Sequence, residues 1–257
     1  MAVTIEQIKE LRESTGVSMM ACKTALEESG GDLDLAVVAL RKKGAAKAAD
    51  RSERATSNGL IVIKKSDEKA AMVELQCETD FVALGDDFVA LGNAVVEKLF
   101  AGEIKEDDSE VAEVKDAVLK MGENLKASHM KFIEADVIGS YVHSNSKIGV
   151  IVALKGGDAD LAGEIAMHVA AANPSVLSPE EIDTALVDKE KEIWTDQLKQ
   201  EGKPEELIEK IMMGKEKKFR EESALLKQAF VKKPDQTIEQ LLSEAGATVE
   251  SFTRFAI

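Results

Sequence analysis

Residues 60–77 read LIVIKKSDEKAAMVELQC and predict an antiparallel β-hairpin. The apolar runs at the two ends are typical of strands, and the polar residues at 66–68 are typical of the turn between them. A helix is expected next, beginning at Asp80 or Asp86, because apolar residues then recur at helical spacing as far as Leu99. This stretch predicts a sheet with a helix packed on it.

The same order returns roughly 80 residues further along the chain. Residues 137–154 contain two apolar runs around a polar turn at 144–146, and a glycine pair follows at 156–157. The next apolar residues, at 161–172, have helical spacing. We therefore expect an α+β fold whose core is a duplicated unit, with a hairpin and a helix in each half.

Three short helices joined by glycine turns are expected before the first hairpin. Thr4, Ser18 and Asp32 are suitable N-cap residues for them, and glycines follow each apolar stripe. The third helix is expected to stop before Gly44. Helices this short form a small bundle with little stability in reserve, so we expect the bundle to be tethered to the core.

The segment after the bundle is rich in Ala, Lys and Arg and has almost no large apolar residue, which favours a helical or flexible linker. Near the other end of the chain, two apolar stripes flank a break at 202–204 and predict an antiparallel helical hairpin. Residues 251–257 read as a final strand that completes a sheet. The expected division is a three-helix N-terminal domain at 1–44, a linker at 45–58, a first core subdomain at 59–136, and a second at 137–257 with the hairpin inserted at about 180–225.

Composition excludes several classes of function. The chain has 257 residues, 44% of them hydrophobic, and 33 Lys and Arg against 48 Asp and Glu, for a formal charge of -15. A surface this acidic repels nucleic acid. No apolar run approaches the ~20 residues of a membrane span, and the two cysteines, Cys22 and Cys77, fit a reducing compartment. We expect a soluble, cytoplasmic protein that binds no membrane and no nucleic acid.

The motifs of catalysis and cofactor binding are missing from the sequence. No GxxxxGK phosphate loop occurs, and the glycine pair at 156–157 leads into acidic residues that would repel phosphate. The three histidines are not placed at ligand spacing with one another or with a cysteine. We therefore expect no direct nucleotide binding, no metal, no cofactor and no enzymatic chemistry of the chain's own.

Two motifs carry a family resemblance. Residues 11–26 read LRESTGVSMMACKTAL and residues 77–83 read CETDFVA, and both resemble signatures of the elongation factor Ts family. Shorter matches follow at 139–141, 148–150 and 166–171. The resemblance covers nearly the whole chain and implies an N-terminal three-helix UBA-like domain, a duplicated core of two antiparallel sheets with packed helices, and an inserted antiparallel coiled-coil hairpin.

The resemblance also implies a function. Members of this family are guanine nucleotide exchange factors in translation elongation: they bind elongation factor Tu in its GDP complex, displace Mg²⁺ and promote GDP release, and are displaced in turn by GTP. The family's motif implies that Asp80, Phe81, Val82 and Ala83 form the site that dislocates Mg²⁺. Without the resemblance, the same residues fit an ordinary capped helix whose Phe81 packs in its first turn.

The resemblance implies further partner contacts in the N-terminal domain and in the second half of the core. They involve Arg12, Met19, Met20 and Lys23, and His143 in the second hairpin. Each has a plainer alternative, since methionines at a helix start commonly fill a small core and a loop histidine is commonly only solvated.

The sequence departs from longer family members at two places. Leu84 follows the CETDFVA motif where a basic residue is common, which puts one polar contact in doubt. Nothing after Ile257 corresponds to the C-terminal helix that some members use, which predicts weaker binding. Two other classes remain as alternatives: a general interaction or holdase module, and a hydrolase that uses Asp80 and nearby carboxylates without an evident base or nucleophile.

Overall fold

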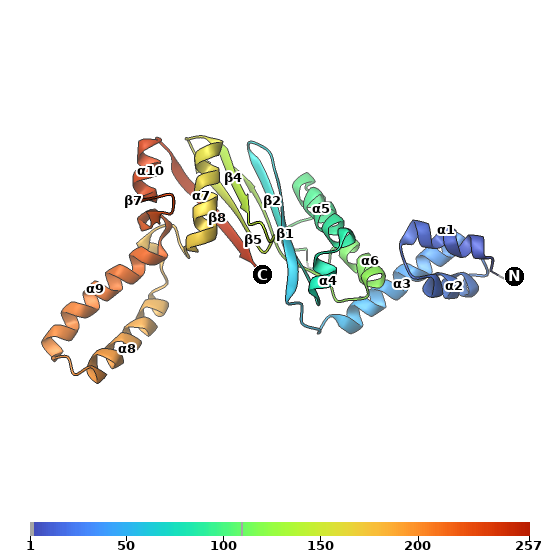
Figure 1. The fold of residues 1–257 in the computed structure, drawn as a ribbon, viewed down its shortest axis with the longest axis horizontal. Coiled ribbons are helices and arrows are strands. Elements are labelled where there is room, and N and C mark those ends of the chain that lie inside the picture. Colours follow the sequence, from blue (N-terminus) through green and yellow to red (C-terminus); the bar gives the residue numbers. More distant parts are fainter. Residues whose placement is uncertain (1–2, 109) are drawn as a thin grey trace.

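Two antiparallel sheets lie face to face at the centre of the protein, with helices on their outer faces (Figure 1). The computed structural model describes residues 3–108 and 110–257. A helical bundle is attached at one end and a pair of longer helices projects at the other (Figure 1). The α+β class is confirmed. Within the described ranges, no helix is both long and apolar enough to cross a bilayer.

The first sheet has the order β1-β2-β3. Its predicted hairpin is confirmed, with Leu60 opposite Leu75 in the register. A third strand and a further helix lie between residues 102 and 136, where the sequence patterns suggested no element. The elements are β1 (Asn58–Lys65), β2 (Lys69–Cys77), α4 (Asp80–Ala83), α5 (Asp86–Ala101), α6 (Ala112–Met121) and β3 (Lys126–Glu134).

The second sheet repeats this arrangement with the order β4-β5-β8. In each sheet the second strand of the hairpin is central, a helix follows it, and a strand from later in the chain pairs with its free edge. This shared topology supports the predicted duplication, and the final strand is confirmed. The elements are β4 (Val137–Val142), β5 (Ile148–Lys155), α7 (Ala159–Ala172) and β8 (Thr248–Ala256).

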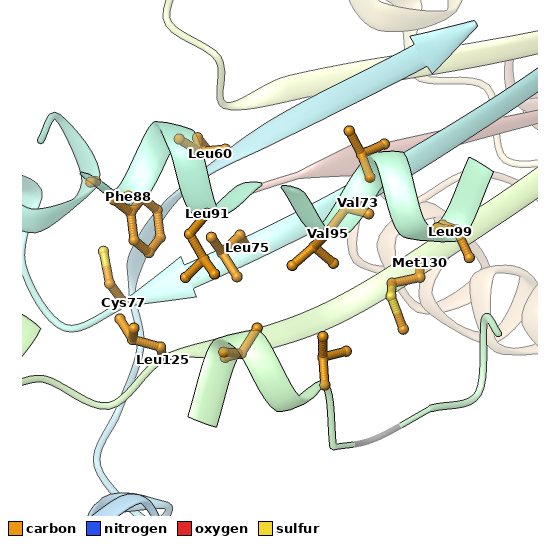
Figure 2. Packing of buried hydrophobic residues seen from close by; sticks show 14 of the residues in the cluster. Leu60, Val73, Leu75, Cys77, Phe88, Leu91, Val95, Leu99, Leu125 and Met130 are labelled. Carbon is orange, nitrogen blue, oxygen red and sulfur yellow. The ribbon is translucent and has the colours of Figure 1, made fainter. Parts of the chain in front are cut away.

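The largest buried cluster lies between α5 and the first sheet (Figure 2). Phe88, Leu91, Val95 and Leu99 recur at helical spacing along α5 and pack over β1, β2 and β3. Each such side chain contributes roughly 1.5–3 kcal/mol when it is fully buried. This packing fixes the position of α5 on the sheet. The first turn of α5 is thereby held near the end of β2.

The two sheets are in close contact through their inner faces. Ile61 and Met72 from the first sheet pack against Ile151 from the second. Gly149 lies so near this seam that a Cβ atom there would be 2.4 Å from Cγ2 of Ile61. The backbone N–H of Ile61 also donates to the carbonyl of Ser146 (2.7 Å), so the turn of the second hairpin is bonded to the edge of the first sheet.

The N-terminal bundle consists of α1 (Ile5–Thr15), α2 (Met19–Glu28) and α3 (Leu33–Arg51), with side-chain caps from Thr4, Ser18 and Asp32 as predicted. The predicted stop of the third helix before Gly44 is wrong. Gly44 is buried in mid-helix and faces α6, where an added Cβ atom would lie in ordinary contact 3.5 Å from Cβ of Leu119. Residues 45–51 of the predicted linker are therefore helical, whereas the domain division itself and the UBA-like character stay predictions.

The helical pair consists of α8 (Thr184–Gln200) and α9 (Glu205–Ser223), which run antiparallel (Figure 1). The rings of Trp194 and Phe219 meet edge to face between them, with centroids 5.7 Å apart. Coiled-coil packing of this pair stays a prediction. The remaining elements are the 3₁₀ turns Pro179–Glu181 and Leu225–Lys227, β6 (Ala229–Phe230), β7 (Lys233–Thr237) and α10 (Ile238–Glu244).

His168 is completely buried on α7 and binds the segment beyond the helical pair. Its Nε2 lies 2.9 Å from Oε1 of Gln228, and its Nδ1 accepts from the backbone N–H of Val231 (3.3 Å). Both contacts require a neutral ring with the proton on Nε2. Burial lowers the pKa of His168, against a smaller opposite effect of the bond to Gln228.

We expect this histidine to make the protein less stable in mild acid. Because the folded pKa lies below the usual 6.5, its contribution is complete above about that pH and falls as the pH drops towards the folded value. Chemical denaturation at several pH values between about 7.5 and 5 should show this slope. His168→Gln should flatten it and the exposed His143→Gln should not; equal slopes in both variants would contradict the assignment.

Candidate functional site

The CETDFVA motif forms an exposed apolar tip beside the first sheet. Phe81 is 87% exposed and Leu84 is 82% exposed, three positions apart on the short α4 turn. Ala83 is buried in the first core cluster and Val82 is half-buried against it. One side of α4 is therefore anchored in the core, and the other presents two large apolar side chains to solvent.

The local sequence explains why the chain turns here. Thr79 is the N-cap of α4, and its Oγ1 accepts from the backbone N–H of Val82 (3.4 Å). The exposed Asp80 occupies the first turn, where a negative charge is favourable. The N–H of Gly85 donates to the carbonyl of Val82 (3.0 Å), which ends α4 before α5 begins. The alternative beginnings at Asp80 and Asp86 thus correspond to two separate helices.

The strand end below the tip is fixed by a buried thiol. Cys77 is fully buried, and its Sγ donates to the carbonyl of Thr79 (3.1 Å). Burial, reinforced by the nearby carboxylate of Glu123, raises the pKa of the Cys77 thiol to about 11. The thiol therefore stays protonated near neutral pH and acts as a packed hydrogen-bond donor.

Glu123, which no sequence pattern singled out, contacts the base of the tip. Its Oε2 accepts from the backbone N–H groups of Glu78 and Thr79, both at 3.0 Å, and its Oε1 accepts from Oγ1 of Thr79 (2.6 Å). Glu123 lies 44 positions from Thr79 in the sequence, directly after the C-cap of α6. No local pattern indicates such a contact.

The N-terminal residues singled out by sequence lie on the surface of the bundle. Met19 is 44% exposed and Met20 is 72% exposed, while Arg12 and Lys23 are also exposed. The bundle core is made by other residues, among them Leu11, Val17, Cys22 and Leu26. The two methionines are therefore not core-filling residues, and they present an apolar surface on α2, the helix that also carries Lys23.

His143 is exposed in the turn between β4 and β5, where its Nδ1 lies 3.0 Å from Oδ1 of Asn145. This turn and α4 lie at the same end of the sheets (Figure 1). Ser146 in the turn is bonded to Ile61 near the start of β1, and β1 begins opposite Cys77, the residue that ends β2 before α4. The second hairpin thus brings His143 to the side from which α4 projects.

An anchored apolar tip on an α+β scaffold is typical of a protein that docks onto another macromolecule. Among the residues that the structure describes, no group of three or more His, Cys, Asp or Glu side chains is placed to hold a metal ion. The sequence of the chain also matches a known protein family. The model of the family described as elongation factor TS matches residues 78–257.

Whole-chain relatives agree with the family match. Elongation factor Ts of Idiomarina loihiensis is 43% identical over 270 residues, which cover 100% of this chain and 91% of the relative. That of Hydrogenovibrio crunogenus is 42% identical, covering 100% and 92%, and that of Pseudomonas syringae pv. syringae is 44% identical, covering 99% and 91%. The chain belongs to the elongation factor Ts family and is a translation elongation factor of protein biosynthesis.

Proposed function

We propose that the protein is a guanine nucleotide exchange factor that acts on elongation factor Tu in the cytoplasm and performs no covalent chemistry of its own. It binds the GDP complex, displaces Mg²⁺ and promotes GDP release, and is then displaced by GTP. The observation that carries the proposal is the 87% exposure of Phe81 on a turn anchored in the core. An aromatic ring held outward on a rigid support is suited to enter a cleft in a partner.

The physical basis is a competition between two binding energies. A GTPase holds Mg²⁺ and the β-phosphate through its phosphate loop and neighbouring helices, so a small shift of those elements weakens nucleotide binding. Burying a phenylalanine contributes roughly 1.5–3 kcal/mol, which stabilises the shifted, nucleotide-free state. Because such coupling is reciprocal, GTP that enters the same site weakens binding of the factor.

The other exposed residues extend the proposed binding surface beyond α4. Met19 and Met20 have adaptable, polarisable side chains that suit a binding face, and the exposed Arg12 and Lys23 supply positive charge on the same bundle. His143 adds a contact from the second half of the core. Within the CETDFVA motif, Asp80 and Phe81 are exposed and face the partner, whereas Val82 and Ala83 support the tip from below.

The test measures release of fluorescent GDP from purified elongation factor Tu, with and without the protein. We expect substoichiometric amounts to accelerate release over many rounds, because GTP or excess GDP frees the factor after each one. A general interaction or holdase module would bind without accelerating release. Release that stays at the unassisted rate when the protein is in excess would overturn the proposal.

A further inference from the structure

A four-residue helix has too few internal hydrogen bonds to hold its own position, because helix nucleation is unfavourable in so short a segment. The direction of Phe81 must therefore be fixed from outside α4. Packing of Ala83 and Val82 fixes the inner side of the turn. The outer side, where the chain leaves β2, is fixed by polar contacts to the segment that comes after α6.

We propose that Glu123 is the positioning residue of the tip and that its carboxylate sets the direction in which Phe81 projects. This inference rests on the proposed function for its consequence, but the contacts stand by themselves. One carboxylate accepts three hydrogen bonds from two consecutive residues, Glu78 and Thr79, at the point where β2 ends. Hydrogen bonds to an ionised acceptor are stronger than neutral ones and restrict direction as well as distance.

The contact to the hydroxyl group acts directly on the cap of α4. Thr79 has a single hydroxyl proton, and it is donated to Oε1 of Glu123 at 2.6 Å. The oxygen lone pairs are thereby left to accept from the N–H of Val82. Glu123 thus orients the N-cap side chain, which in turn orients the first turn of the helix that carries Phe81.

The contacts of Glu123 with Glu78 and Thr79, called the clamp below, are made rigid by a reciprocal contact. While the N–H of Glu78 donates to Glu123, the N–H of Asn124 donates back to Oε1 of Glu78 at 2.7 Å. The amide of the buried Asn124 donates to the carbonyl of Arg54 (2.8 Å), just beyond the end of α3. The end of β2, the residues after α6 and the end of α3 are therefore bonded to one another at one point.

The same segment connects the tip to the N-terminal bundle. Glu123 comes directly after the C-cap of α6, and Leu119 on α6 packs against the bundle core. α6 also packs beneath α5 through Val114 and Val118. Glu123 consequently links the position of Phe81 to that of the bundle surface that carries Met20, which favours simultaneous contact of both with one partner.

The experiment compares Glu123→Gln with a matched control, Glu106→Gln. The amide introduced at position 123 would keep one acceptor and place N–H groups against donors, whereas Glu106 accepts from the backbone N–H of Phe132 (2.8 Å) on β3 and lies outside the clamp. We expect Glu123→Gln to slow factor-dependent GDP release roughly tenfold and to raise amide hydrogen exchange at residues 78–84 roughly tenfold, while the melting temperature falls by only roughly 3–6 °C. The control should leave both readouts at wild-type values.

A double-mutant cycle separates positioning of Phe81 from any other effect. If Glu123 acts through the ring, Glu123→Gln should cause little further loss of exchange activity in a Phe81→Ala background. An equal loss in both backgrounds, or wild-type activity and hydrogen exchange in Glu123→Gln, would overturn the inference. If Glu123→Gln is unfolded at the temperature of the assay, Thr79→Val provides a second variant, because it keeps the side-chain shape but removes the hydroxyl.

Failure of the two proposals can be told apart. If the wild-type protein does not accelerate GDP release, the exchange function is wrong, and hydrogen exchange in the free protein then decides for or against the clamp. If the wild-type protein is active and Glu123→Gln matches it in both readouts, only the clamp is wrong.

Discussion

Phe81→Ala is expected to lower the rate of factor-dependent GDP release roughly 10- to 100-fold, because in the proposed mechanism the ring supplies roughly 1.5–3 kcal/mol of the binding energy that stabilises the nucleotide-free partner. The measurement is release of fluorescent GDP from elongation factor Tu at a fixed, substoichiometric concentration of each variant. Since the ring is 87% exposed in the free protein, its removal should change the free energy of unfolding by less than about 0.5 kcal/mol.

A matched control removes an equally exposed apolar side chain far from the tip. Met213 is 72% exposed on α9, in the helical pair at the end of the molecule away from the N-terminal bundle (Figure 1). Met213→Ala should keep wild-type exchange activity, and Phe81→Leu should lie between alanine and wild type because it retains part of the apolar surface. Equal release rates with Phe81→Ala and wild type would remove the ring from the mechanism.

Gly139→Ala is expected to destabilise the protein by about 3 kcal/mol, the upper part of the usual range for overpacking. Gly139 lies on β4 directly beneath α7, and a Cβ atom there would be 2.2 Å from the carbonyl carbon and oxygen of Ala162. Backbone atoms cannot rotate away as a flexible side chain can, so α7 would have to move off the sheet. Urea denaturation followed by circular dichroism measures the effect.

The control for this substitution lies one residue beyond the contact. Gly163 is next to Ala162 on α7, but nothing lies within 4 Å of its missing Cβ. Gly163→Ala should therefore stabilise the protein by roughly 0.5–1 kcal/mol, the usual gain for replacing a glycine within a helix. A Gly139→Ala protein as stable as wild type would show that α7 is not seated on β4 as described.

Elements with strong periodicity could be predicted from the sequence. Both hairpins, the helix after each of them and the final strand were found because their apolar residues recur at the spacing of one element type. β3 was not found, since it begins with the polar segment KASH and its pairing with β2 is a long-range contact. The stop at Gly44 was wrong for a related reason: a glycine buried in the middle of a helix has the same local sequence appearance as one that ends a helix.

The candidate site was only partly predictable. Thr79, Asp80 and Phe81 stand next to one another in a recognisable motif, and the family resemblance indicated that the ring faces outward, whereas residue chemistry by itself also allowed a packed ring. No local sequence pattern singled out Glu123 as part of the site, because its three contacts join segments that are distant in sequence. Contacts of that kind follow from the tertiary fold and are invisible to local spacing.

The duplicated core is symmetrical in its strands but not in the segments that leave the two central strands. After β2 the chain forms α4 and its exposed ring, whereas after β5 it turns at Gly156 and Gly157, both at positive φ, and enters α7 at once. In the part of the chain that the structure describes, an exposed aromatic ring therefore follows the central strand of the first sheet and not that of the second. Although the strand arrangement is built twice, the projecting ring lies beside one of the two central strands, so the proposed insertion into a partner uses the first half of the core alone.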